Sequence, residues 1–206
     1  MKTAHILLAA ACIATSASAL AAPNEGLYVA ASLGQAHTSL DTSNTMHATT
    51  ITSDSTNKLG LGLALGYRFN QHIGAELAYV DFGKPTYDLV RGTSGEVSQL
   101  TVQNTALVLS AVGYLPLNEA FTLTGKAGAA FVHTKVDRVG APGHDDTYHV
   151  SDDQLHPTFG IGATYKLSSN LDLRMNLDWY PKITKTNDNA TDTNAYMLGL
   201  GLQYNF

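Results

Sequence analysis

The last twelve residues of the chain, 195–206, alternate between two kinds of side chain. Every second residue from Leu198 to Phe206 is large and apolar, and the residues between them are small or polar. Because successive side chains of a β-strand point to opposite faces, this pattern predicts a strand with one apolar face and one small or polar face. A soluble sheet seldom leaves such a strand unpaired, whereas a closed barrel pairs it with the first strand.

Seven earlier segments alternate in the same way, which predicts eight strands. They are residues 26–36, 58–69, 72–82, 101–115, 121–135, 154–166 and 171–183. Each is close to the ~9–11 residues that a tilted membrane strand requires. The segment 101–115 is apolar on both sides around 107–112. Val112 and Tyr114 are assigned to its large apolar face, and Gly113 is assigned to its small-residue face.

The connections between these segments alternate between two lengths. Short turns are expected at 70–71, 116–120 and 167–170, and the long polar connections are about 37–57, 83–100, 136–153 and 184–194. Outer-membrane barrels have short turns in the periplasm and long loops outside. An even number of strands would place both termini at the periplasmic rim.

The charged residues of the strands distinguish a membrane barrel from a soluble one. Soluble barrels turn their apolar face inward and a charged face outward, but here the second face is rich in Gly, Ala, Ser and Thr. The charges on this face are Glu76, Lys126, Arg174 and Asp178. An Arg or Lys exposed to lipid near the midplane costs roughly 2–4 kcal/mol, so these side chains are predicted to point inward and pair.

Aromatic residues gather near the predicted strand ends, as in the interfacial girdles of membrane barrels. They are Tyr67, Phe69, Tyr114, Phe121, Tyr165, Trp179, Tyr180, Tyr204 and Phe206. Together, these patterns predict an all-β fold, namely an eight-stranded antiparallel up-and-down transmembrane β-barrel.

Residues 1–21 resemble a secretory signal peptide. A basic residue precedes an apolar stretch over 6–14, and Ala19-Leu20-Ala21 is the expected cleavage motif. The stretch is shorter than the ~18 residues of a spanning helix, and Cys12 lies in a poor context for lipid attachment. Residues 22–206 are therefore expected to form one mature domain without cysteine.

Four short passages resemble the transmembrane barrel of the outer-membrane protein A family. They are Tyr28-Val29-Ala30-Ala31-Ser32-Leu33-Gly34, Gly74-Ala75-Glu76-Leu77-Ala78-Tyr79, Val112-Gly113-Tyr114-Leu115-Pro116 and Leu173-Arg174-Met175-Asn176-Leu177-Asp178-Trp179. Their order and spacing along the mature chain carry the resemblance, although other small outer-membrane barrels share the pattern. Many family members continue into a peptidoglycan-binding domain, whereas this chain ends on its last strand, so a barrel-only member is expected.

The resemblance implies an interior salt-bridge network that closes the lumen. The matching interior charges are Glu76, Lys126 and Arg174. The family has a further base and acid where this chain has Ala111 and Thr164, so a thinner or differently paired network is expected, with Asp172 or Asp178 as a substitute acid.

The resemblance also implies partners. Tyr204 and Phe206 resemble the C-terminal signal that the outer-membrane assembly machinery reads. Outer-membrane lipid and lipopolysaccharide are expected to surround the barrel, and host cells or phage are candidate partners of the loops. The chain carries a net charge of −5, and loss of Lys2 with the signal would make it more acidic, which argues against a nucleic-acid partner.

These patterns favour two classes of function. One is a structural or surface-interaction barrel with a filled, charge-paired lumen, and the alternative is a narrow porin-like channel for small solutes. The interior of an eight-stranded barrel is just filled by side chains, which favours the first class. A soluble ligand-binding barrel of the export pathway is a third candidate.

The connection 136–153 contains candidate metal ligands and part of a catalytic motif, but an acidic, solvated loop is the favoured interpretation. His144, Asp145 and His149 are candidate metal ligands, but their spacing matches no standard site, so no metal or cofactor is expected. His149-Val150-Ser151 matches half of a motif of lipid-modifying barrels. The last glutamate of the chain is Glu119, upstream of it, so no enzymatic activity is expected.

Overall fold

The computed structural model describes residues 25–39, 49–51, 57–83, 86–91, 97–139, 148–184 and 193–206. These residues form the strands β1 (Gly26–Ser39), β2 (Thr49–Ile51), β3 (Asn57–Arg68), β4 (Ile73–Asp81), β5 (Thr86–Arg91), β6 (Val97–Pro116), β7 (Phe121–Val139), β8 (Tyr148–Lys166), β9 (Leu171–Thr184) and β10 (Thr193–Asn205). None of the described residues forms a helix long and apolar enough to cross a bilayer.

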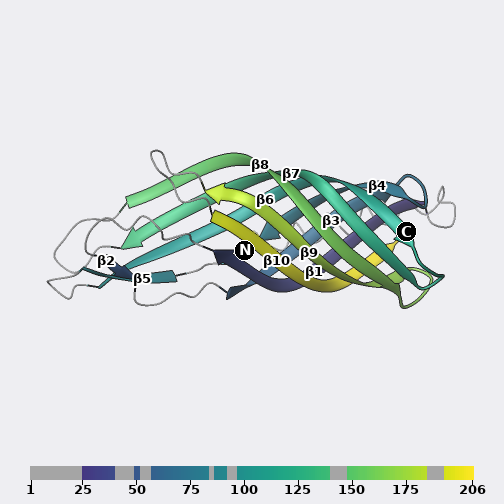
Figure 1. Cartoon of the computed structure of the whole chain (residues 1–206), viewed down its shortest axis with the longest axis horizontal. Coiled ribbons are helices and arrows are strands. Elements are labelled where there is room, and N and C mark those ends of the chain that lie inside the picture. Colours follow the sequence, from purple (N-terminus) through teal and green to yellow (C-terminus); the bar gives the residue numbers. More distant parts are fainter. Residues whose placement is uncertain are drawn as a thin grey trace, which may run out of the picture.

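Eight of these strands close into an antiparallel barrel (Figure 1). Neighbours around the barrel follow the order β6, β4, β3, β1, β10, β9, β8, β7, and pairing of β7 with β6 closes the circle. The first and last strands pair from Tyr28 opposite Asn205 to Ser39 opposite Asn194. The predicted eight-stranded barrel is confirmed, and its closure leaves the C-terminal strand without a free edge.

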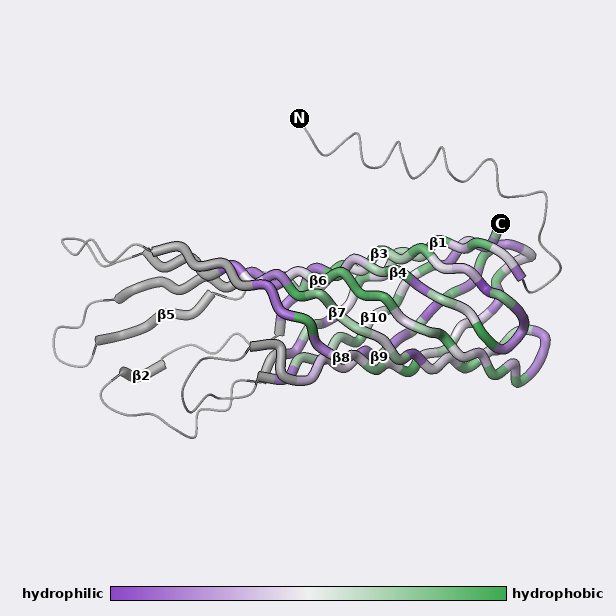
Figure 2. Tube along the Cα trace, turned by 90° about the horizontal axis from the view of Figure 1, so that it is seen from above, coloured by the Kyte–Doolittle hydropathy of each residue, from purple (hydrophilic) through white to green (hydrophobic). Residues whose placement is uncertain are grey.

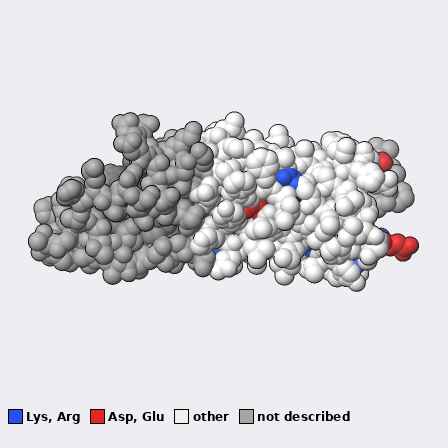
Figure 3. Space-filling model, viewed as in Figure 1, with Lys and Arg blue, Asp and Glu red and all other residues white. Residues whose placement is uncertain are grey.

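The outer face of the barrel is apolar. Large side chains on alternate positions point outward on every strand of the barrel, and Leu59 on β3 is 74% exposed. Figure 2 shows hydrophobic residues along the barrel and hydrophilic residues at its turns, and Figure 3 shows few charged side chains on the described part of one face. So large an apolar exterior is stable when lipid surrounds it.

The predicted parity of residues 101–115 is wrong. Val112 and Tyr114 of β6 point into the barrel and are only 3% and 6% exposed. The outward residues are Leu107, Leu109, Ala111, Gly113 and Leu115. The register fixes this parity, because Ser110 lies opposite Glu76 and directly opposed residues share a face. The sequence misleads here because both faces of the strand are apolar.

Two further assignments are corrected by the same alternation. Ala111 is exposed on the outer face, so it is not an interior position of the barrel. Tyr180, predicted in the aromatic girdle, is buried inside the barrel because it follows Asp178 by two residues on β9. Exposed rings do lie at two levels of the outer face. Those near the short turns are Tyr67, Phe69, Tyr165 and Tyr204, and those near the long connections include Phe159, Trp179 and Tyr196.

Several strands extend into the ranges predicted as long connections. The range 83–100 contains β5 and the start of β6, and 136–153 contains the end of β7 and the start of β8. The range 37–57 contains the end of β1, all of β2 and the first residue of β3. The range 184–194 contains the last residue of β9 and the first two residues of β10. Above a membrane both faces of a strand contact water, so the alternation disappears while the backbone pairing continues.

The three short turns lie together at one end of the barrel, named here the short-turn end. Two of these turns are held by the same pattern of hydrogen bonds. Asn70 Oδ1 accepts bonds from the backbone N–H groups of His72 and Ile73, and Asn118 Oδ1 accepts bonds from those of Ala120 and Phe121. An asparagine side chain that bonds the backbone two residues on favours a tight turn.

Candidate functional site: the barrel interior

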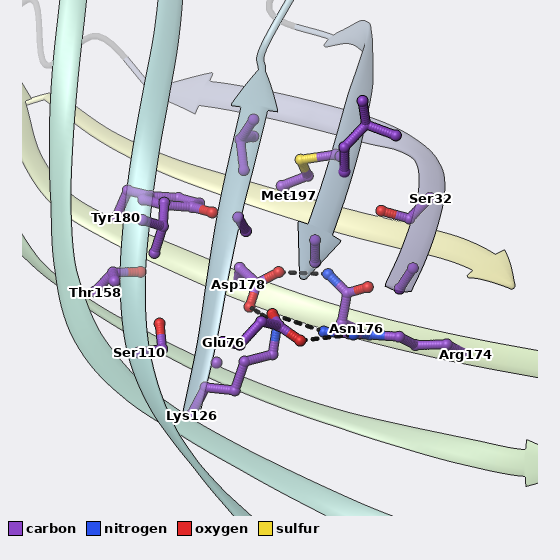
Figure 4. Close-up of a pocket in the computed structure, with 18 of the residues that line it drawn as sticks. Ser32, Glu76, Ser110, Lys126, Thr158, Arg174, Asn176, Asp178, Tyr180 and Met197 are labelled. Carbon is purple, nitrogen blue, oxygen red and sulfur yellow. Dashed lines mark hydrogen bonds and ion pairs between the residues drawn. The ribbon is translucent and has the colours of Figure 1, made fainter. Parts of the chain in front are cut away.

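A layer of charged side chains crosses the middle of the lumen (Figure 4). It is named here the charge layer and consists of Glu76 from β4, Lys126 from β7, and Arg174 and Asp178 from β9. Arg174 Nη1 lies 2.7 Å from Glu76 Oε2, and Lys126 Nζ lies 3.1 Å from Glu76 Oε1. Lys126 Nζ also lies 3.4 Å from Asp178 Oδ1, so two bases meet two acids.

The structure brings together the four residues that the sequence places on the small-residue face. Asp178 is the acid that accompanies Glu76, and Asn176 donates a further hydrogen bond to it. Asp172 lies on the same face but at the short-turn end, where it accepts a hydrogen bond from Asn205. Thr164 is buried and faces the lumen. The interior therefore contains buried salt bridges, with Asp178 as the second acid beside Glu76.

Two tyrosines complete the layer, and the sequence interpretation missed them. The hydroxyl of Tyr28 donates a 2.8 Å hydrogen bond to Glu76 Oε2, and the hydroxyl of Tyr114 donates a 3.1 Å bond to that of Tyr28. Gly66 lies between Tyr28 and Glu76 in the strand register, and a Cβ there would fall 2.0 Å from the Tyr28 ring. An inward tyrosine opposite a glycine on the next strand was the available signal.

The surroundings of Glu76 determine how strongly the layer is held. The side chain is 3% exposed and receives hydrogen bonds from Tyr28, Lys126 and Arg174. A buried ion pair gains little net free energy against desolvation, but removal of one partner leaves a buried charge uncompensated. Glu76 and its three donors therefore join β4 to β1, β7 and β9 in one arrangement, which is sensitive to the loss of any member.

A second layer of buried, mainly hydrophobic side chains lies on the side of the long connections, and the polar side chain of His156 is buried at the level of Ala130. This apolar plug consists of Ala36, Val80, Phe82, Ala106, Val108, Ala130, Val132, Tyr180, Ala195 and Met197. The rings of Phe82 and Tyr180 pack edge to face with centroids 5.0 Å apart. All of these side chains come from inward positions of the strands or from Phe82 just beyond β4.

Little space remains between the charge layer and the apolar plug. A cavity of about 30 Å³ lies there, bordered by Glu76, Asp178, Tyr180 and Met197 among others. A buried water needs roughly 10–15 Å³ measured in this way, so the cavity has room for about two waters. Beyond the charge layer, at the short-turn end, the lumen widens into a polar vestibule of about 260 Å³.

The other candidate residues lie elsewhere. Tyr204 points outward near the end of β10, and the ring of Phe206, the next residue but one, packs against it with centroids 5.0 Å apart. The Phe206 N–H donates to the Leu27 carbonyl. His144 and Asp145 lie outside the described residues, and His149 belongs to β8, opposite Asp137. Among the described side chains, no group of three or more His, Cys, Asp and Glu is placed to hold a metal ion.

The fold and the sequence both match known proteins. The model of the OmpA-like transmembrane domain matches residues 22–206. The chain belongs to this family. Outer membrane protein A of Shigella flexneri is 26% identical over 155 residues, which cover 73% of this chain and 41% of that protein. The matched regions span 41% to 56% of the lengths of the curated relatives named outer membrane protein A, so this OmpA-like chain corresponds to about half of such a protein.

Two solved structures share the barrel fold. Neisserial surface protein A superposes with a TM-score of 0.56 at 18% identity, over 87% of this chain and 97% of that one. Ail, the attachment invasion locus protein of Yersinia pestis, was solved with the heparin analogue sucrose octasulfate. It superposes with a TM-score of 0.51 at 16% identity, over 87% and 99% of the two chains. This OmpA-like chain is therefore a β-barrel of the bacterial outer membrane.

Proposed function

We propose that this OmpA-like barrel is a closed membrane anchor whose long connections contact partners outside the cell. The observation that carries the proposal is the filling of the lumen by two different layers in series. The charge layer blocks a through-path with ion-paired side chains, and the apolar plug fills the lumen beyond it with buried, mainly hydrophobic side chains. A barrel closed in both ways is poorly suited to passive transport.

The lengths of the strands support a role in display. β6, β7 and β8 have 20, 19 and 19 residues, against the ~9–11 that a membrane strand requires. On β7 and β8 the outward face becomes polar at His133 and Asp153, which pair at 2.5 Å, and both strands continue beyond that level. Paired strands that leave the bilayer form a stiff support for the connections they carry (Figure 1).

The charge of the connections suggests the chemistry of a partner. Residues 136–153 contain the single base Arg138 against the five acids Asp137, Asp145, Asp146, Asp152 and Asp153. Ail was solved with a sulfated heparin analogue, but an acidic connection would repel such a polyanion. We therefore propose a basic or uncharged partner surface, on a host cell, a phage or a neighbouring bacterium.

The orientation of the barrel is part of the proposal. We place the short-turn end and both termini in the periplasm, with residues 1–21 as a signal peptide and Tyr204 and Phe206 as the signal for the assembly machinery. Lipopolysaccharide would then surround the outward rings near the long connections. The asymmetry between short turns and extended strands supports this orientation.

The proposal is tested by display and by permeability together. An epitope inserted at Gly143, within the long connection, should be labelled by antibody on intact cells, whereas one inserted at Ser168 in a short turn should be labelled only after permeabilisation. Liposomes that contain the wild-type chain should not swell in isotonic small sugars. Labelling at Ser168 on intact cells would overturn the orientation, and rapid swelling would favour the narrow channel instead.

A further inference from the structure

The vestibule at the short-turn end is a polar cavity that the closed-anchor function does not use. Its volume is about 260 Å³, and its wall includes Tyr28, Arg68, Thr122, Thr164 and Asp172. Drug-sized ligands occupy pockets of roughly 300–1,000 Å³, so this cavity suits a small solute. The charge layer lies directly beyond Tyr28, and the vestibule is therefore a blind chamber open at one end.

Arg68 is the cation in the wall of this chamber that is held most rigidly. Its guanidinium Cζ lies 4.2 Å from the centroid of the Tyr114 ring, and Tyr114 is itself fixed by its hydrogen bond to Tyr28. Stacking on an aromatic face fixes the plane of a guanidinium and leaves its N–H edge free to bind. The Nε atom of Arg68 is buried, and none of the described residues accepts a hydrogen bond from it.

The acids of the vestibule do not neutralise Arg68. Asp172 accepts a 2.9 Å hydrogen bond from Asn205 Nδ2, and Asn205 is held in turn by a 2.8 Å bond from Gln203. Glu25 and Glu119 are exposed at the rim. Within the described part of the chain Arg68 makes no ion pair, although it shares a cavity with three carboxylates. Because the Nε atom is buried, the terminal Nη groups of Arg68 are the donors that a ligand in the vestibule can reach.

We propose that the vestibule binds the carboxylate of a small, singly charged solute, with Arg68 as the anion-binding group. A guanidinium fork matches a carboxylate through two parallel hydrogen bonds. Thr122 and Thr164 lie opposite one another across β7 and β8 and add hydroxyl groups to the same wall. The acids at the rim repel dianions such as phosphate more than monoanions, so a carboxylate is preferred.

This inference goes beyond the proposed function, and its test does not depend on loops or orientation. The probe is acetate, added to the ¹⁵N-labelled chain in micelles at neutral pH and constant ionic strength. The Nε–Hε resonance of Arg68, identified by its loss in Arg68→Lys, should shift with saturation, as should the side-chain amide resonances of Asn170 and Asn205, which line the cavity. Phosphate should bind more weakly than acetate.

Variants separate the fork of Arg68 from its charge. Arg68→Gln should abolish the saturable shifts, and Arg68→Lys, which keeps the charge, should weaken binding at least about five-fold because it loses the bidentate geometry. Lys166→Gln removes the other cation of the cavity and should change affinity by less than about two-fold, because Lys166 is exposed and screened. An unchanged amide spectrum outside the vestibule controls for folding.

Three results would overturn the inference. Acetate shifts that are absent or rise linearly mean that no site exists. Shifts that persist in Arg68→Gln place the binding elsewhere. Phosphate that binds more tightly than acetate contradicts the assignment to a carboxylate.

Discussion

The charge layer and the apolar plug fill the same lumen by opposite means. In the charge layer, Glu76 is held by donors from three strands besides its own, and each atom has a defined position. In the apolar plug, Phe82, Tyr180 and Met197 fill space through contacts that other apolar side chains could also make. The charge layer therefore specifies the strand arrangement, whereas the apolar plug fills the lumen with less demand on geometry.

The strongest test of this contrast is Glu76→Ala in the charge layer. The change leaves Lys126 and Arg174 with Asp178 as the remaining acid of the layer, and it removes the acceptor of Tyr28. Breaking a buried ion pair from one side costs about 3–5 kcal/mol, and we expect a loss of unfolding free energy in that range. Urea unfolding in micelles measures it. Arg174→Ala should also lower stability, and an unfolding midpoint equal to wild type for both would contradict the proposed role of the layer.

Truncation in the apolar plug should cost less than loss of Glu76. Met197→Ala removes a fully buried side chain that borders the small cavity next to the charge layer. Met→Ala changes cost about 2–5 kcal/mol, and we expect the lower end because water can enter the enlarged cavity. Met197→Leu keeps the volume and should cost less than about 1.5 kcal/mol. If the leucine variant is as unstable as the alanine variant, the plug is as specific as the charge layer.

A smaller effect than that of Glu76→Ala or Met197→Ala is expected at the boundary between the charge layer and the vestibule. Tyr28→Phe keeps the ring but removes the hydroxyl that joins Glu76 to Tyr114. A hydrogen bond to a charged group contributes about 1.5–3 kcal/mol, and we expect a loss near 1.5 kcal/mol because Arg174 and Lys126 still hold Glu76. Thermal unfolding followed by far-ultraviolet circular dichroism measures the change. A loss as large as that of Glu76→Ala would show that the tyrosine, not the ion pairs, holds the layer.

Alternation along the strands made most of the barrel predictable from sequence. Wherever large and small residues alternate cleanly, as from Leu198 to Phe206, the outward and inward faces follow directly. It failed in β6, where both faces are apolar and the pairing with β4 decides which one turns inward. It also missed the strand extensions outside the bilayer, because water on both faces removes the selection for alternation.

The candidate site was predictable in its charges but not in its neighbours. Glu76, Lys126, Arg174 and Asp178 share the parity of their small neighbours, and a closed barrel of this width brings such residues together. The apolar plug was not foreseen because Tyr180 resembles a girdle residue at the end of its strand and Phe82 lies just beyond β4. The inward position of Tyr180 follows from its alternation with Asp178 on β9, whereas Phe82 lies beyond the alternating residues of β4.

Single-channel recording in planar bilayers tests whether the lumen is closed twice in series. The samples are the wild type, Glu76→Ala, the double variant Phe82→Ala/Met197→Ala, and the triple variant that combines all three changes. Each is checked for β-structure by circular dichroism. We expect the wild type and both partial variants to remain closed and the triple variant to conduct. A stable open channel in the wild type, or in Glu76→Ala alone, would contradict closure by two layers and would indicate a transport barrel.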